Sequence, residues 1–208
     1  MAKQKKKIGQ HASFNKGAML ALFLTSYTPL FLIIILKQFF SNYEFLNFTG
    51  FSLGGVLCFI QKFGLTCVFI PLILFGFIGL KILLKNLSKK ANYNGYQAQI
   101  TAVKNQNDQF SNYLVSYIIP IAFLSSDEII DSVLILIILY VIYRLYVKSS
   151  MILVNPMLSF IGYYLYECEY IIDKNKETGI LLIDDKALEE GDSIFLYPIG
   201  YKSYYSKK

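Results

Sequence analysis

The chain has 208 residues, of which 55% are hydrophobic and 16% are charged, and its formal net charge is +6. Soluble domains carry about 25% charged residues, so this composition argues against an ordinary soluble domain and indicates a membrane protein. The lysines lie beside apolar blocks rather than along one amphipathic face. We therefore interpret them as determinants of membrane topology and predict no direct binding of nucleic acid.

The first part of the chain is expected to cross the membrane twice. Residues 1–16 are basic and are predicted to form a cytoplasmic N-terminus. Residues 17–84 are predicted to hold transmembrane helices 1 and 2, over 17–36 and 63–84, because each block is close to the ~20 residues that a crossing helix needs. The outside loop 37–62 between them is rich in Phe and Tyr and is expected to lie at the membrane interface.

Two features inside these blocks concern helix packing. Gly76 and Gly79 would let another helix approach closely. The segments "LTSYTP" (24–29) and "LVSYIIP" (114–120) place hydroxyl side chains before a proline. Such residues either line a water-filled cavity or hold helices together, and packing is the favoured interpretation.

Residues 85–109 are predicted to form a cytoplasmic loop with a β-strand. Lys85, Lys89 and Lys90 follow the second span directly and are expected to contact anionic lipid headgroups, at about 1 kcal/mol each. After an Asn-Gly turn sequence, polar and apolar residues alternate over 96–103, which predicts a strand with one buried face. Such a strand needs partners, and later residues are expected to supply them.

Residues 110–147 are predicted to form a transmembrane helical hairpin, with helix 3 over 110–126 and helix 4 over 129–147. Three acids lie at or near the tip of this hairpin: Asp127, Glu128 and Asp131. Basic residues flank the hairpin, so the acidic tip is expected to lie outside. Two alternatives stay open: the short segment 110–126, which holds Pro120, re-enters the membrane without crossing it, or the acids form a ring that selects cations in a pore.

Residues 148–208 are predicted to form a small cytoplasmic β-domain. Pro156 interrupts an apolar stretch that would otherwise suggest a fifth span. Strands are predicted over 163–173, 180–185 and 194–200, separated by turn sequences. With the strand at 96–103 they would make one sheet from two separate parts of the chain.

No catalytic or cofactor chemistry is apparent in the sequence. The three cysteines and the single histidine show no metal-binding spacing, and we find no nucleophile–base pair and no phosphate loop. We therefore predict that the protein is not an enzyme and binds no cofactor or metal. The predicted fold class is a membrane protein, an all-α four-span transmembrane bundle with a small cytoplasmic β-domain and both termini cytoplasmic.

Three short motifs together resemble a known family. They are "SYTPLF" (26–31), "NYLVSYIIP" (112–120) and "NPMLSFIGYYLYE" (155–167). They are similar to the KwaA family, the membrane subunits of the Kiwa anti-phage defence system of bacteria. The resemblance implies a four-span inner-membrane protein that assembles as a tetramer, recognises phage infection at the membrane and recruits a cytoplasmic DNA-binding partner, KwaB. It implies no catalytic residues.

Two main hypotheses for function follow. The first is a non-enzymatic sensor and scaffold whose inside surface, made from 85–109 and 150–208, docks a partner. The predicted docking residues are Tyr96, Gln97, Asn155, Pro156, Tyr164 and Tyr166. The second is a small oligomeric ion channel or pore-forming effector, motivated by the acidic tip and the hydroxyl-rich kinks. A membrane-bound enzyme is the least favoured, because acid, base and metal ligands are missing from the predicted spans.

Overall fold

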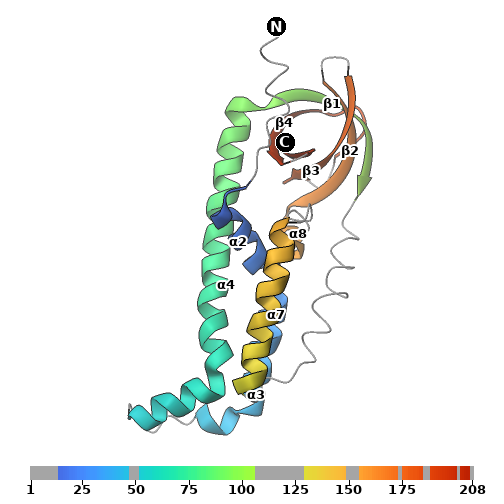
Figure 1. Ribbon diagram of the computed structural model, residues 1–208. Helices are drawn as coiled ribbons and strands as arrows, with labels where there is room; N and C mark the ends of the chain where they lie inside the picture. Colours follow the sequence, from blue (N-terminus) through green and yellow to red (C-terminus); the bar gives the residue numbers. More distant parts are fainter. Residues whose placement is uncertain are drawn as a thin grey trace. The chain divides into compact units, whose positions relative to one another are not determined.

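The structure is a computed structural model that describes residues 14–46, 52–105, 129–148, 155–172, 175–184, 188–200 and 202–206. Its contacts divide the chain into two compact units. The helical unit contains Leu20–Leu80 and Phe110–Asn155, and the barrel unit contains Met1–Met19, Lys81–Gln109 and Pro156–Lys208. One long helix, α4, belongs to both units (Figure 1).

The helices form where apolar residues run without interruption. They are α2 (Lys16–Ser26), α3 (Thr28–Ser41), α4 (Leu53–Asn94), α7 (Ile129–Lys148) and the short α8 (Pro156–Phe160), with a 3-10 turn η1 (Tyr43–Leu46). Many large apolar side chains of α4 and α7 are exposed rather than buried. Such surfaces are expected of helices whose solvent is lipid.

Two glycines allow α4 to lie close against α2. A Cβ atom on Gly76 would lie 2.9 Å from the Cβ of Leu24, and one on Gly79 would lie 2.7 Å from the Cβ of Ala21. Real Cβ atoms do not approach so closely, so larger residues at 76 and 79 would push the two helices apart. The close approach predicted for these glycines is confirmed.

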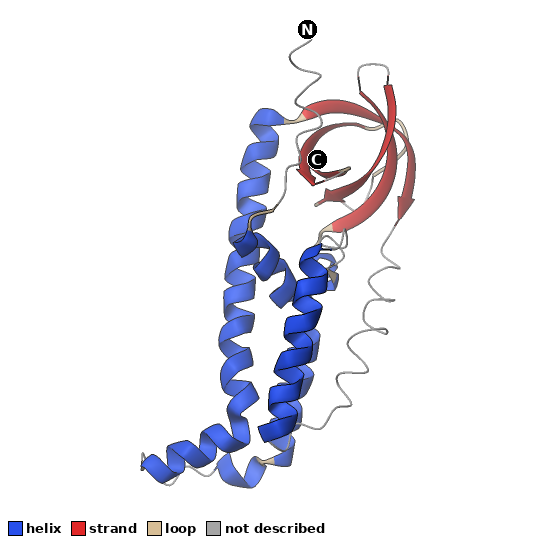
Figure 2. Cartoon of the chain, in the orientation of Figure 1, coloured by secondary structure: helices blue, strands red, loops and turns tan. Residues whose placement is uncertain are grey.

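The five strands form one closed barrel (Figure 2). They are β1 (Tyr96–Asn105), β2 (Tyr164–Ile172), β3 (Asn175–Ile183), β4 (Ser193–Gly200) and β5 (Ser203–Ser206). The order around the barrel is β1-β2-β3-β5-β4, and β3 and β5 are parallel while the other pairs are antiparallel. A small five-stranded barrel of this kind is the architecture of the OB-fold.

Strand β1 closes the barrel because it pairs on both sides. Its first residues, from Tyr96, pair with β4, and its later residues, to Asn105, pair with β2. The register shifts between Ile100 and Ala102, which marks a bulge where the strand turns from one neighbour to the other. The prediction that segment 96–103 joins the strands of the tail is confirmed.

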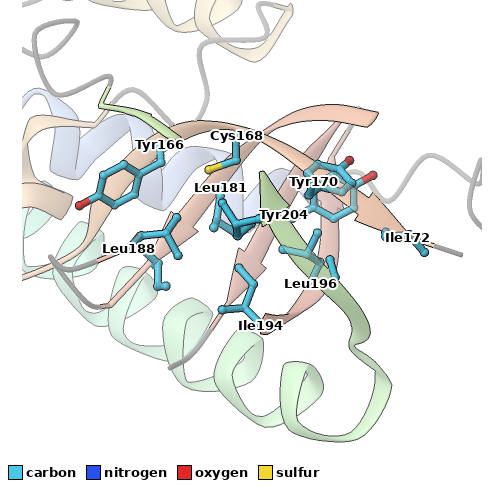
Figure 3. Packing of buried hydrophobic residues seen from close by; sticks show 12 residues of the cluster. Tyr166, Cys168, Tyr170, Ile172, Leu181, Leu188, Ile194, Leu196 and Tyr204 are labelled. Carbon is cyan, nitrogen blue, oxygen red and sulfur yellow. The ribbon is translucent and has the colours of Figure 1, made fainter. Parts of the chain in front are cut away.

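The barrel core is apolar and rich in tyrosine. Side chains from every strand and from Leu188 point inward and pack together (Figure 3). Gly179 on β3 makes room for this packing, since a Cβ there would lie 2.8 Å from the Lys202 carbonyl oxygen and 3.1 Å from the ring of Tyr204. The alternation predicted for the tail strands therefore places its apolar residues inside a barrel.

The predicted all-α four-span bundle is wrong. Among the described residues, two helices are long and apolar enough to cross a membrane, within Leu53–Ala91 and Ile130–Lys148, and a third crossing requires that α2 and α3 together count as one span. The predicted span 17–36 is divided at Tyr27, where α2 and α3 meet at a bend of 52°. The predicted span 110–126 lies outside the described residues. The closed barrel makes the fold mixed rather than all-α.

Helices also extend into segments that were predicted to be loops. In the predicted outside loop 37–62, α3 continues to Ser41 and α4 begins at Leu53. Helix α4 then continues through 85–94, because Leu, Lys and Ala are good helix formers and nothing stops the helix before Gly95. In the tail, β3 begins at Asn175, within the predicted turn, and β5 was not predicted.

We expect the substitution Gly179→Ala to weaken the barrel by about 1–3 kcal/mol, because the new methyl group meets backbone at Lys202. The readout is maleimide labelling of Cys168, which is buried, in a full-length chain whose other cysteines, Cys58 and Cys67, are changed to serine. Labelling should become about 5- to 150-fold faster. The matched control is Thr178→Ala, an exposed neighbour on β3 that should label like the parent chain. Equal rates for the two variants would contradict this account of Gly179.

Candidate functional site

The structure separates the predicted docking residues into two groups. At the starts of β1 and β2, Tyr96 and Tyr164 are half-buried and Gln97 is exposed, so all three keep some accessible surface. Asn155, Pro156 and Tyr166 are buried. Burial prevents a partner from reaching the second group in this protomer, so we do not retain these three as docking residues. Docking by the first group stays a prediction.

The side chain of Asn155 links two distant parts of the helical unit by hydrogen bonds. Its side-chain amide donates to the carbonyl oxygen of Leu22 at 3.1 Å and to Oγ1 of Thr25 at 2.9 Å. The Thr25 hydroxyl in turn donates to the carbonyl oxygens of Ala21 and Leu22, at 2.8 and 3.1 Å. Asn155 therefore ties the chain before α8 to the last turn of α2.

The break at Tyr27 follows from the residues around it. Pro29 lies in the first turn of α3 and has no N–H to donate to the Thr25 carbonyl, so the helix cannot continue regularly through this point. Thr25, Ser26 and Thr28 are buried here, and the Thr28 hydroxyl donates to the Leu24 carbonyl at 3.2 Å. Thr25 bonds to the distant Asn155, whereas the Thr28 bond is local. The packing interpretation of segment 24–29 stays a prediction. Its counterpart at 114–120 lies outside the described residues.

A second break lies in α4 at Phe63, whose φ of −119° and ψ of 23° are not helical. In a regular helix the Thr66 N–H would donate to the Lys62 carbonyl. Here the Thr66 N–H donates to Oε1 of Gln38 at 2.9 Å, and its hydroxyl donates to the same oxygen at 2.8 Å. The Lys62 carbonyl accepts from Nδ2 of Asn42 at 3.4 Å. The side-chain amides of Gln38 in α3 and of Asn42, the residue after α3, thus replace the acceptor and the donor of the interrupted backbone hydrogen bond.

Gln38, Asn42 and Thr66 were not predicted as site residues. The pattern that could have found them is a polar side chain within or beside an otherwise apolar block, because such a group needs a partner in the membrane. Gln38 and Thr66 are both buried.

The predicted acidic tip is only partly within the structure. Asp127 and Glu128 lie outside the described residues, and Asp131 lies in the first turn of α7 with a half-buried side chain. Its carboxylate is favourably placed for the positive end of the helix dipole. A role of these acids at a tip or in a pore stays a prediction.

The three predicted lipid-contacting lysines lie on the last turns of α4. Lys85, Lys89 and Lys90 are all exposed. Lys90 also lines a pocket of about 250 Å³ in the barrel unit, with Asn15, Asn86 and Tyr197 among the other lining residues. An ammonium and two amides suit an anionic group such as a lipid headgroup. Headgroup contact by these lysines stays a prediction.

Metal ligands and cysteines are the last candidate groups for chemistry. No group of three or more His, Cys, Asp or Glu side chains in the part of the chain that the structure describes is placed to hold a metal ion. Cys168 is buried in the barrel core, and burial, with a smaller contribution from Glu167, raises the pKa of its thiol from 9.0 to about 12. The thiol therefore stays protonated and unreactive near neutral pH.

The features above define a protein that joins apolar helices, long enough to cross a membrane, to a small closed β-barrel. The chain matches the family model described as anti-phage protein KwaA over residues 18–205, and it therefore belongs to this family. It is 25% identical to the Kiwa protein KwaA of Escherichia coli O55:H7 over 192 residues, which cover 89% of this chain and 92% of that protein. No solved structure matches the chain.

We expect Asn155→Ala to destabilise the helical unit by about 1–3 kcal/mol, because the Leu22 carbonyl and the Thr25 hydroxyl lose a buried donor. Thermal unfolding of the full chain in detergent, followed by circular dichroism, measures the loss. The control Asn86→Ala makes the same truncation at an exposed position on α4 and should leave the midpoint unchanged. A normal midpoint for Asn155→Ala would refute the structural role.

We also expect the barrel to lose stability in alkali. The unfolded Cys168 thiol releases its proton near pH 9.0, whereas the folded thiol keeps it up to about pH 12. Between these values the unfolded chain binds fewer protons, so the free energy of unfolding falls as pH rises, by about 1.4 kcal/mol per pH unit at most for one group. Burial also raises the pKa of Tyr170 and Tyr205 above 10.0, which adds to the loss.

Denaturant unfolding of the full chain below and above pH 9.0 measures this dependence. The variant Cys168→Ala should show a smaller loss between these conditions, and the part that remains belongs to the tyrosines. An unchanged pH dependence in the variant would show that Cys168 does not titrate in this way.

Proposed function

We propose that the protein is a membrane-embedded sensor and scaffold subunit of its anti-phage defence system, which assembles with copies of itself and recruits a cytoplasmic partner through the barrel. The observation that carries the proposal is the connection of the barrel to both candidate spans. Helix α4 leads into β1 through Gly95 alone, and α7 is followed by α8 and β2. A shift of α4 would therefore act directly on strand β1.

The charges support a cytoplasmic barrel. Lys85, Lys89 and Lys90 lie at the end of α4 that leads to β1. Arg144 and Lys148 lie at the end of α7 that leads to α8 and β2, and both are exposed. Basic residues collect on the cytoplasmic side of membrane spans. We therefore place these ends, the barrel and both termini on the cytoplasmic side of the bacterial inner membrane.

The partner is expected to contact the outer side chains of the barrel. The barrel is closed, so β1 to β5 leave no free edge for an added strand. Gln97 and Phe195 lie directly opposite each other on β1 and β4, and Phe195 is 55% exposed although it is aromatic. Exposed aromatic residues are typical anchors of protein interfaces. We propose that Phe195, with Gln97, is the centre of the docking surface. Tyr96 packs against the barrel core instead.

The proposed partner and assembly rest on the resemblance in sequence motifs. This resemblance implies KwaB, a cytoplasmic DNA-binding protein, as the partner and a tetramer as the assembly. The exposed apolar faces of α4 and α7 provide surface for contact between copies as well as with lipid. We propose no enzymatic step, since the role requires binding and movement only.

The test is purification of the tagged full-length chain with KwaB in mild detergent, followed by native mass spectrometry. A homo-oligomer carrying KwaB supports the proposal. Phe195→Ala should lower the retained KwaB about tenfold or more, as loss of an interface anchor does. The control Glu177→Ala removes an exposed side chain of β3, at a distance in the sheet order from the β1–β4 pair, and should retain KwaB. Equal retention by both variants would contradict the proposed docking surface.

One observation keeps a second candidate function, an oligomeric ion channel or pore-forming effector. The Ser26 hydroxyl at the Tyr27 break is buried and has no hydrogen-bond partner among the described residues. A water-filled path would supply one. A homo-oligomer that carries no partner but conducts ions in a planar bilayer would support this function over the scaffold.

A further inference from the structure

The first turns of α4 form a separate helical segment, Leu53–Lys62. The break at Phe63 divides this segment from the rest of α4, and Figure 1 shows these turns pointing away from the long part of the helix. The bonds from Gln38 on α3 and from Asn42, the residue after α3, stabilise the break. The change of direction is therefore built into the helical unit by specific side chains.

One face of the segment packs against its own unit. The ring of Phe59 lies 4.9 Å from that of Phe63, and the Phe63 ring lies 5.4 Å from that of Phe39 on α3, between ring centroids. Phe63 is fully buried. This contact fixes which side of the segment faces the protein.

The other face is apolar and exposed. Leu53 is 85% exposed, Leu57 is 65% exposed and Ile60 is 53% exposed, and Val56 is exposed between them. The spacing 53, 56, 57 and 60 is that of a single stripe on an α-helix. Water would be an unfavourable neighbour for this stripe.

The surroundings of the stripe favour lipid over protein as its partner. The segment carries no acidic residue, and its one charge, on Lys62, lies 5.0 Å from the centre of the Phe45 ring. Phe40 and Tyr43, at the end of α3 and the start of η1, are also exposed. Aromatic and lysine side chains together are typical of the boundary between headgroups and acyl chains. The segment is also continuous with the candidate span of α4.

We propose that Leu53–Lys62 is an in-plane lipid-binding helix at the α3–α4 end of the helical unit. It buries the stripe of Leu53, Val56, Leu57 and Ile60 at the boundary between headgroups and acyl chains of that leaflet. This inference rests on the proposed embedding in the membrane and deepens it. It gives the sensor a surface that responds to the lipids of one leaflet, connected to α3 through the bonds at the Phe63 break.

The chain contains no tryptophan, so a single introduced tryptophan reports its own surroundings without background. Leu57→Trp places the probe in the stripe, and Leu74→Trp places it at a 60% exposed position within the span part of α4. Phe195→Trp serves as a probe on the barrel. Each full-length variant is reconstituted into phosphatidylcholine–phosphatidylglycerol vesicles, with nitroxide-labelled lipids that carry the quencher either near the headgroup or near the acyl-chain end.

The tryptophan at position 57 should be quenched about twofold or more strongly by the shallow lipid than by the deep one, because an in-plane helix buries its apolar face only about 5–10 Å. The order should reverse at position 74, and position 195 should show little quenching by either lipid. If position 74 is quenched but position 57 is not, solvent or a second copy of the chain covers the stripe and the inference is refuted. Stronger deep quenching at position 57 would also refute it. Absence of quenching at position 74 would instead refute the embedding itself.

Discussion

A backbone N–H or C=O group that leaves a regular helix in an apolar environment needs another partner from the chain, and the break at Phe63 shows how this protein meets that need. At the Phe63 break, Oε1 of Gln38 accepts a hydrogen bond from the Thr66 N–H, and Nδ2 of Asn42 donates one to the Lys62 carbonyl oxygen. Each unsatisfied group would cost several kcal/mol in hydrocarbon. The break that divides Leu53–Lys62 from the rest of α4 is stabilised by these two amides.

The barrel meets the same requirement by closing on itself. With β1 paired to both β2 and β4, no strand is left with an open edge in the described sheet. A free strand edge could pair with the same edge of a second copy of the chain. Because the barrel is closed, a partner protein can contact its strands only through their outward side chains. Exposed residues such as Phe195 would then determine where a partner binds.

The sequence allowed the strands to be predicted better than the helices. Alternation over 96–103 and in the tail is local, and β1, β2 and β4 lie close to where it placed them. The start of β3 and the whole of β5 were missed. The break at Tyr27 was missed because the apolar residues of 17–36 predict one continuous helix. The break follows from Pro29, and the bond between Thr25 and Asn155 beside it joins residues that are 130 positions apart. Gly76 and Gly79 correctly predicted a close helix contact, because a residue without a side chain leaves room for a neighbouring helix. Asn155 belongs to the motif at 155–167, and its side chain bonds within the helical unit. No local sequence pattern distinguishes this internal role from recognition of a partner at the surface.

The split of the barrel across the chain has a consequence for biosynthesis. Strand β1 leaves the ribosome before α7, whereas its neighbours β2 and β4 follow α7, and β5 ends only at Ser206. During translation β1 therefore lacks its partners until residues 164–206 have been made. If a membrane separated β1 from these later strands, the barrel could not close. Closure thus requires that both parts of the sheet lie on the same side of any membrane that the chain crosses.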